Sequence, residues 1–316
     1  MADNGEYRTA IVPTDVKYTY ELMTNVIRKL AETYPYLEVG TIGRSVMGKD
    51  ILYLKLGRGQ TQVCYNASFH ANESITTPVL LKFAEQMMQA YTDGSDVQGV
   101  EPRRLFSACT LYLVPMVNPD GVDLVNNALT QGEYYNRARA IGNQYPGIPF
   151  PDGWKANIEG VDLNLQFPAG WDRAKEIKFA QGYNRPAPRD YVGLAPLSAP
   201  ESRAMYEFTV NHNFELILAY HTQGEVIYWK YLNYEPENSY KIARYFAQVS
   251  GYLVEETPVA SGYAGYKDWF IQDYDRPGYT VEAGLGTNPL PMDQFPKIYS
   301  DNLGILLGGL TEIKKI

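Results

Sequence analysis

The stretch "VCYNASFHANESITTPVLL", Val63–Leu81, joins an apolar run, a His-x-x-Glu pair and a segment with helical character. The apolar run predicts a buried strand, and the segment after the pair predicts a helix. His70 and Glu73 fall between the two at positions i and i+3, so their side chains lie on one side of a turn just past the strand end. An imidazole and a carboxylate at the edge of a core need partners, and the rest of the chain must supply them.

Helical and strand-like segments alternate along the whole chain. The expected strands are short and nearly all apolar, as in a sheet covered on both faces, so the pattern predicts an α/β fold. Three local signals set element ends: Thr77 as N-cap, a capping box of Ser198 and Glu201, and "NPDG" as a turn that closes a strand. The expected helices are Lys17–Thr33, Pro78–Tyr91, the segment "SAPESRAMYEFTVNHN", the segment "SYKIARYFAQVS" and Met292–Ile313. The expected strands are "LEVGTIG", "ILYLKLG", "QVCYNASF", "CTLYLVPMV", "FELILAY", "EVIYW" and "GYTVEAG".

Composition describes a globular protein with a sizeable core. The 316 residues are 45% hydrophobic and 20% charged, and we expect one domain spanning 1–316. The net charge of −8 and the lack of a basic run argue against nucleic-acid binding. No run of roughly 18 apolar residues occurs, so no membrane insertion is expected.

The N-terminus shows no signal-peptide pattern, which predicts a cytoplasmic location. Cell-wall or spore association is the alternative if an N-terminal module has been removed. Cys64 and Cys109 lie in strand-like runs and are expected to be buried free thiols.

The segment from Ile141 to Pro200 differs from the rest. It holds eight of the chain's 20 prolines and few periodic runs. Because Trp154 and Trp171 lie within it, we expect an ordered binding rim, with a purely structural role for these aromatic residues as the alternative.

A metal site at His70 and Glu73 requires a third protein ligand. Zinc accepts nitrogen and oxygen donors and, in catalytic sites, takes three protein ligands and leaves one position to water. His212 follows a helix, where a histidine commonly favours the helix dipole. His221 ends the strand "FELILAYH", and sites form at the carboxyl ends of strands in α/β sheets, so His221 is the better candidate.

The order of motifs carries more weight than any one of them. Along the chain come strand–His–x–x–Glu–helix, then "NPDG", then "GVDLN", then strand–His, then strand–Glu in "YTVEAG". This order resembles the zinc carboxypeptidase family of metallopeptidases over almost the whole chain, and "IGRSVMGKDILYLKLG" is similar to that family's N-terminal segment. The resemblance implies a mixed, mostly parallel sheet of about eight strands with helices on both faces, and one bound Zn²⁺.

The resemblance also implies roles for individual residues. His70, Glu73 and His221 would hold zinc, and Glu282 matches the catalytic glutamate that takes a proton from water and delivers it to the leaving amine. The family's oxyanion-stabilising arginine is replaced by Lys155 in "WKAN". The alternatives for this role are Arg137 and Arg139 in "NRARA", or Lys155 is simply solvated. Asp162 and Asn164 in "GVDLN" match positions that support the site and contact substrate.

The chain departs from the family where exopeptidases bind the substrate's terminal carboxylate. Leu165 stands in place of the arginine that pairs with it, and a leucine cannot form such a pair. Pro258 stands in place of the family tyrosine, with Tyr263 and Tyr266 close behind as candidate substrate contacts. Lys267 stands at the position that selects the side chain beyond the scissile bond. Simple carboxypeptidase action is therefore not expected.

The stretch "GVDLNLQFPAGWD" and the later "RPAPRDYVGLAPLSAPE" look most like the bacterial subgroup that cleaves γ-D-glutamyl–diaminopimelate bonds in peptidoglycan peptides. Such a substrate carries α-carboxylates on both sides of the scissile bond, and the cations available to bind them are Lys155, Lys267, Arg185 and Arg189. The alternatives are a zinc carboxypeptidase, an amide deacylase, or a non-catalytic protein that binds murein peptides. Retention of all three ligands and Glu282 argues against the last of these.

Overall fold

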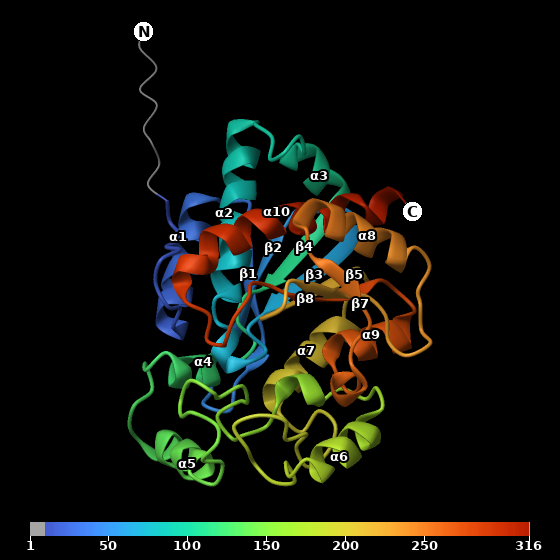
Figure 1. The fold of residues 1–316 in the computed structure, drawn as a ribbon. Coiled ribbons are helices and arrows are strands. Elements are labelled where there is room, and N and C mark those ends of the chain that lie inside the picture. Colours follow the sequence, from blue (N-terminus) through green and yellow to red (C-terminus); the bar gives the residue numbers. More distant parts are fainter. Residues whose placement is uncertain (1–9, 316) are drawn as a thin grey trace.

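Eight strands form one mixed sheet in the computed structural model, which describes residues 10–315 (Figure 1). The spatial order of the strands is β1-β2-β4-β3-β5-β8-β6-β7. Four neighbouring pairs are parallel, β3 with β4 and β5, β5 with β8, and β6 with β7; the other three are antiparallel. The strands are β1 Glu38–Arg44, β2 Asp50–Leu56, β3 Thr61–Ala67, β4 Cys109–Val114, β5 Phe214–His221, β6 Val226–Tyr228, β7 Leu253–Glu255 and β8 Gly278–Glu282. The predicted fold class is confirmed.

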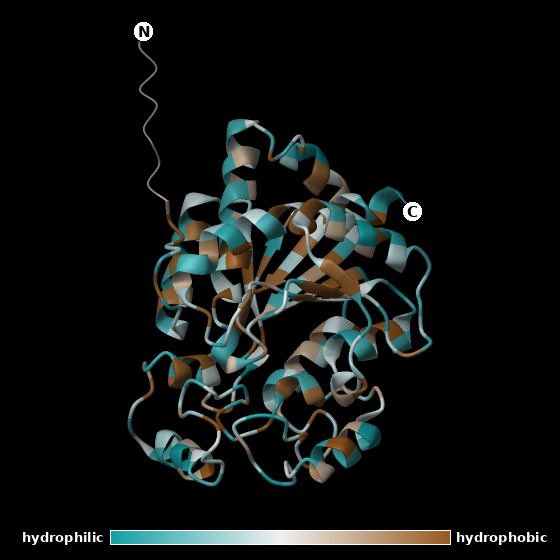
Figure 2. Ribbon diagram, viewed as in Figure 1, coloured by the Kyte–Doolittle hydropathy of each residue, from teal (hydrophilic) through white to brown (hydrophobic). Residues whose placement is uncertain are grey.

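Helices cover both faces of the sheet. The α-helices are α1 Tyr20–Thr33, α2 Thr76–Asp93, α3 Pro102–Ala108, α4 Pro119–Val125, α5 Glu133–Gly142, α6 Trp171–Ala180, α7 Pro200–Val210, α8 Ser239–Ser250, α9 Tyr266–Tyr274 and α10 Phe295–Thr311. In Figure 1, α2, α8 and α10 lie above the sheet, whereas α7 and α9 lie below it. Figure 2 shows hydrophobic residues along the central strands between these two layers.

Alternation along the central strands supplies both apolar layers. In β5, Leu216, Leu218 and Tyr220 belong to the core cluster under α2, α8 and α10. Ile217 and Ala219 belong to the opposite cluster with residues of α7 and α9. Because successive side chains of a strand point to opposite faces, His221 lies on the same face as Ile217 and Ala219. The face that packs on α7 and α9 is therefore the one that carries the site.

Several predicted element ends differ from the structure. Helix α2 begins at Thr76, and Thr77 lies inside it, with its hydroxyl donating to Pro115 O. The expected capping box does not form, because Ser198 donates to Gln166 and Glu201 accepts from other segments. These hydroxyl and carboxylate groups find partners in distant segments, and a local motif cannot show such partners.

The turn expected at "NPDG" is the start of helix α4. Asn118 is its N-cap, accepting from Gly121 N, and Pro119 occupies the first turn. The preceding strand β4 therefore ends at Val114, earlier than expected. Helices α1, α7 and α10 are also shorter than expected by a few residues at one or both ends.

Two further expectations concern the cysteines and membrane-spanning segments. Cys64 and Cys109 are buried free thiols, as predicted. Among the described residues, no helix combines the length and the apolar character needed to cross a membrane.

Candidate metal centre and catalytic cleft

The site lies at the carboxyl ends of three parallel neighbouring strands. His70 follows β3, His221 is the last residue of β5, and Glu282 is the last residue of β8. His221 and Glu282 are direct partners in the parallel register of β5 and β8. Parallel strands bring their carboxyl ends to one edge of the sheet, which explains why residues distant in sequence meet here.

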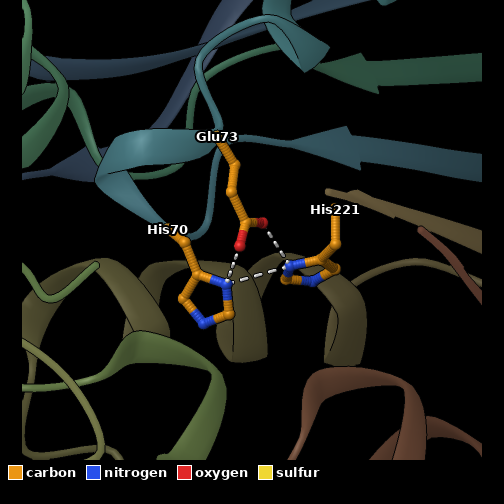
Figure 3. A group of neighbouring side chains, drawn as sticks. All are labelled: His70, Glu73 and His221. Atoms are coloured by element: carbon orange, nitrogen blue, oxygen red, sulfur yellow. Dashed lines mark hydrogen bonds and ion pairs between the residues drawn. The ribbon is translucent and has the colours of Figure 1, made fainter. Parts of the chain in front are cut away.

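Three buried side chains converge on one point (Figure 3). His70 Nδ1 lies 3.0 Å from Glu73 Oε1, and His221 Nδ1 lies 2.9 Å from Glu73 Oε2. The two Nδ1 atoms lie 3.1 Å from each other. The predicted ligand candidates are thus brought together with their donor atoms facing one another.

This arrangement fits a small divalent cation. Two ligands each about 2.0–2.2 Å from a tetrahedral zinc ion lie roughly 3.3 Å apart, close to the separations found here. Two imidazoles and one carboxylate are also a donor set that zinc accepts. The two imidazole nitrogens face each other and contact the same carboxylate. A cation between these donor atoms accounts for the arrangement best.

A second carboxylate orients the first histidine. His70 Nε2 lies 3.1 Å from Asp162 Oδ1, and Asp162 also accepts from Asn164 N and Asp190 N. Burial opposes the charge on His70, but Glu73 and Asp162 outweigh it and raise the pKa of His70 to about 9. Burial opposes the charge on Asp162 too, but His70 and Lys155 hold the pKa of Asp162 below its usual range. The carboxylates thus make this buried region favourable for positive charge.

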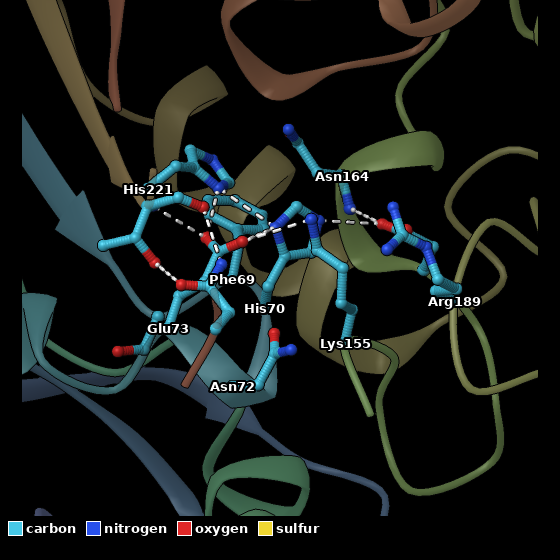
Figure 4. A network of polar contacts seen from close by, with 12 residues as sticks. Phe69, His70, Asn72, Glu73, Lys155, Asn164, Arg189 and His221 are labelled. Carbon is cyan, nitrogen blue, oxygen red and sulfur yellow. Dashed lines mark hydrogen bonds and ion pairs between the residues drawn. The ribbon is translucent and has the colours of Figure 1, made fainter. Parts of the chain in front are cut away.

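Lys155 lies beside the candidate ligands (Figure 4). Its Nζ is 3.2 Å from Glu73 Oε1. Burial lowers the pKa of Lys155, but Glu73 and Asp162 outweigh burial and raise it, so the ammonium is charged at neutral pH. The backbone fixes the loop, since Lys155 N donates to Pro188 O and Ala71 N donates to Lys155 O.

Glu282 has the environment of a general base. Burial and the nearby charge of Glu73 raise the pKa of Glu282 to about 8, although Lys155 opposes the shift. A carboxyl group with a pKa near neutrality can both accept and release a proton at working pH.

Two cavities meet at Glu282. The larger, of about 550 Å³, is lined by Lys155, Arg189, Tyr228 and residues of the loops after β5 and β8. The smaller, of about 140 Å³, is lined by Asn164 and Lys267 and also by Tyr228 and Glu282. A third cavity, of about 960 Å³, lies between α1 and α2 and contains none of the predicted site residues.

Lys267 is buried and already shares its charge. Its Nζ donates to Lys230 O at 2.6 Å and lies 2.6 Å from Asp268 Oδ1. Lys267 lines the smaller cavity, and its ammonium forms an ion pair with Asp268.

Arg137 and Tyr266, which were both predicted to act in the cleft, lie away from these cavities. Arg137 is exposed on α5, where it pairs with Glu133 and Glu159, and it lines neither cavity. Tyr266 is fully buried and its hydroxyl contacts Thr209 Oγ1 at 2.9 Å, which corrects its predicted role as a substrate contact.

The other aromatic residues predicted at the binding rim also lie elsewhere in the structure. Tyr263 is half-buried and lines a separate cavity with Tyr231. Trp154 is fully buried and donates to Asn157 O, and Trp171 is buried and donates to Val192 O. The two tryptophans therefore fasten the irregular 141–200 segment internally.

Tyr228 is a cleft residue that sequence analysis missed. It lines both cavities and lies on β6, whose Val226 pairs with Glu282 in the antiparallel register. Because residues two apart on a strand share a face, Tyr228 lies diagonally next to Glu282. The alternation of "EVIYW" fixes this face, but only the strand pairing shows what Tyr228 faces.

Comparisons with known proteins agree with this geometry. The family model described as zinc carboxypeptidase matches residues 23–303. The chain is 48% identical over 293 residues to a γ-D-glutamyl-L-diamino acid endopeptidase from Lysinibacillus sphaericus, covering 93% of this chain and 72% of that protein.

Solved structures resemble the fold at lower identity. Carboxypeptidase A from Helicoverpa armigera aligns with a TM-score of 0.73 and 19% identity, covering 98% of this chain and 77% of that one. Murein-tripeptide amidase MpaA from Escherichia coli O157 aligns with a TM-score of 0.52 and 19% identity, covering 85% and 91% of the respective chains.

Proposed function

The chain belongs to the zinc carboxypeptidase family, and from that premise we propose that it hydrolyses the γ-D-glutamyl–diaminopimelate bond of peptidoglycan-derived peptides. The observation that carries the proposal is the convergence of His70, Glu73 and His221 next to a buried Glu282. The similarity to a γ-D-glutamyl-L-diamino acid endopeptidase supports the choice of bond.

In this proposal His70, Glu73 and His221 would hold one zinc ion. Zinc bound there would polarise the scissile carbonyl and make a coordinated water more acidic. Asp162 holds the ring of His70 through Nε2, so that Nδ1 faces the other two ligands.

Glu282 moves the proton. Its carboxylate takes a proton from the attacking water and delivers it to the nitrogen of the leaving diaminopimelate. The raised pKa of Glu282, with burial as its main cause, suits a group that performs both transfers.

Lys155 stabilises the negative oxygen that develops on the scissile carbonyl. It is charged and lines the cavity in which Glu282 stands. An ammonium acts as a point charge where the family arginine offers a planar fork, so Lys155 supplies charge without bidentate geometry.

The smaller cavity receives the amine-side residue. Asn164 and Lys267 line it, and Leu165, which is buried, offers no charge for a terminal carboxylate. Lys267, paired with Asp268, would contact the diaminopimelate part of the substrate.

The whole chain, 1–316, would act as one catalytic domain. We place it in the cytoplasm, with the cell wall or spore as the alternative that cell fractionation would decide.

A comparison of three substrate classes tests this function. The zinc-loaded protein is incubated with L-Ala-γ-D-Glu-meso-diaminopimelate, with a peptide bearing an ordinary C-terminal residue, and with an N-acyl amino acid. Mass spectrometry should show release of diaminopimelate from the first and little change in the others. Release of the C-terminal residue from the second peptide alone would instead establish carboxypeptidase action. Deacylation of the third substrate alone would establish deacylase action. Binding of the first peptide without cleavage would establish a non-catalytic protein.

A further inference from the structure

Arg189 lines the larger cavity together with Lys155 and Glu282. In Figure 4, Arg189 lies on the side of Lys155 away from His221. Its side chain is 43% exposed, so it is open to a ligand yet held by the fold.

A chain of charges fixes the orientation of Arg189. Arg189 Nε donates to Asp190 Oδ2 at 2.5 Å, and the buried Lys178 donates through Nζ to Asp190 Oδ1 at 2.6 Å. Asp190 N in turn donates to Asp162, which contacts His70. The arginine is therefore tied to the same framework as the candidate metal ligands.

Arg189 has charge and donors to spare. Asp190 is shared between two cations, so Lys178, Asp190 and Arg189 together carry one excess positive charge. Within residues 10–315, the two terminal nitrogens of Arg189 have no hydrogen-bond partner in the structure. Lys155 differs, because its ammonium already contacts Glu73. The exposed Asp152 is another charged residue of this cavity.

We propose that Arg189 binds the free α-carboxylate of the γ-linked glutamyl residue, a step that rests on the proposed function. A γ-linkage places two methylenes between the scissile carbonyl and the carbon that carries this carboxylate, so the carboxylate can reach past Lys155 to the wall of the cavity. A guanidinium fork binds a carboxylate through two parallel hydrogen bonds. In an α-linked peptide the α-carboxyl group is consumed in the scissile bond, so Arg189 selects γ-linked substrates.

A matched pair of substrates tests this assignment. One is L-Ala-γ-D-Glu-meso-diaminopimelate; the other carries an amide in place of the glutamyl α-carboxylate. The wild-type protein should cleave the acid with a kcat/KM about 10- to 100-fold above that of the amide. Arg189→Gln should reduce kcat/KM for the acid by more than for the amide, so that the acid-to-amide ratio falls to about 3 or less. Arg189→Lys should give an intermediate ratio, and it replaces the Gln variant as the deciding protein if that variant does not fold.

Arg185→Gln is the control, because Arg185 is an exposed arginine of the same segment that does not line the cavity. Its acid-to-amide ratio should equal that of the wild type. An unchanged ratio in the Arg189 variants, with both peptides still cleaved, would overturn the role of Arg189 and leave the proposed function standing. Cleavage of neither peptide by the wild type would overturn the proposed function and this inference with it.

Discussion

Asp162 acts on the candidate metal site through a single histidine. Its Oδ1 lies 3.1 Å from His70 Nε2, and its Oδ2 accepts from Asp190 N. A carboxylate in this position fixes the ring orientation and increases the basicity of the nitrogen that faces the metal. Asp162 thus supports the candidate ligand set through His70 alone, without a contact to Glu73 or His221.

Replacement of Asp162 by Asn should weaken zinc binding. An amide keeps the shape of the side chain but loses the negative charge that supports His70, so we expect an affinity about 10- to 100-fold lower. Competition between the protein and a zinc chelator measures the change. Equal affinities of the two proteins, with the same unfolding midpoint, would show that Asp162 does not act on the metal.

At this scale the sequence predicted which three residues converge at the candidate metal site, whereas Tyr263 and Tyr266, predicted as substrate contacts, lie away from the cleft. His70 and His221 are visible because each lies at or just past a strand end, and Glu73 because it follows His70 at i+3, and both patterns are local along the chain. Tyr228 was not predicted, since its place beside Glu282 depends on a strand pairing. Arg189 was named only as one of four available cations, because its place in the cavity depends on how a long loop folds. The role predicted for Tyr266 as a substrate contact was wrong, because its hydroxyl has a buried hydrogen-bond partner on α7.

Helix α4 connects the loop that carries His70 to the loop that carries Lys155. Its N-cap, Asn118, is fully buried and accepts from Gly121 N through Oδ1. Its Nδ2 donates to Phe69 O, next to His70, and to Ala156 O, next to Lys155. One side chain therefore starts the helix and holds both loops at a fixed separation.

Asn118→Ala should destabilise the protein by about 2–4 kcal/mol, because it removes a cap and leaves two buried carbonyl groups without a partner. Asn118→Asp separates the two roles, since it keeps the acceptor for Gly121 N and loses the donors to Phe69 and Ala156. Urea unfolding measures stability and kcat measures the effect on the loops. An Asp variant as active and stable as the wild type would show that the cap alone matters.

The segment "NPDG" shows why this element was misread. Asn and Pro favour both a β-turn and the first turn of a helix, so composition alone does not separate the two. The residues after Gly121 decide the outcome, because Val122, Leu124 and Val125 are all buried in the structure. Helix α4 is short, and a short apolar stretch gives little periodicity to detect.

Glu201 links three distant parts of the molecule. It lies on α7, and its two oxygens accept from Val46 N, between β1 and β2, and from Asn157 Nδ2, next to the Lys155 loop. Burial raises the pKa of Glu201 from its ordinary value of 4.5 to about 7, although these hydrogen bonds oppose the shift.

This shift makes stability depend on pH. In the folded protein Glu201 binds its proton more tightly than it does in the unfolded chain. Its contribution to the free energy of unfolding is therefore complete below pH 4.5 and is lost as pH rises through about 7. A Gln side chain cannot accept both hydrogen bonds, so Glu201→Gln should cost about 1–3 kcal/mol at pH 5. The difference from wild type should be smaller at pH 8, as measured by urea unfolding at both values.

Glu207→Gln is the control, since Glu207 is exposed on the same helix and its replacement should change stability little at either pH. A wild-type advantage that grows from pH 5 to pH 8 would contradict the account of Glu201.

The fold class itself was predictable because alternating helices and apolar strands allow few arrangements. Links such as that of Glu201 were not, because they join residues that only the finished fold brings together.

The central claim is that water attacks the γ-carbonyl of D-glutamate with Glu282 as the base. The most direct test is hydrolysis of L-Ala-γ-D-Glu-meso-diaminopimelate in ¹⁸O-labelled water, with Glu282→Gln alongside. We predict one ¹⁸O atom in the γ-carboxyl group of L-Ala-D-Glu, free diaminopimelate, and a rate lower by about 10²–10⁴-fold in the variant, which should still bind zinc. Label at another carbonyl, or equal rates in the two zinc-loaded proteins, would contradict the account.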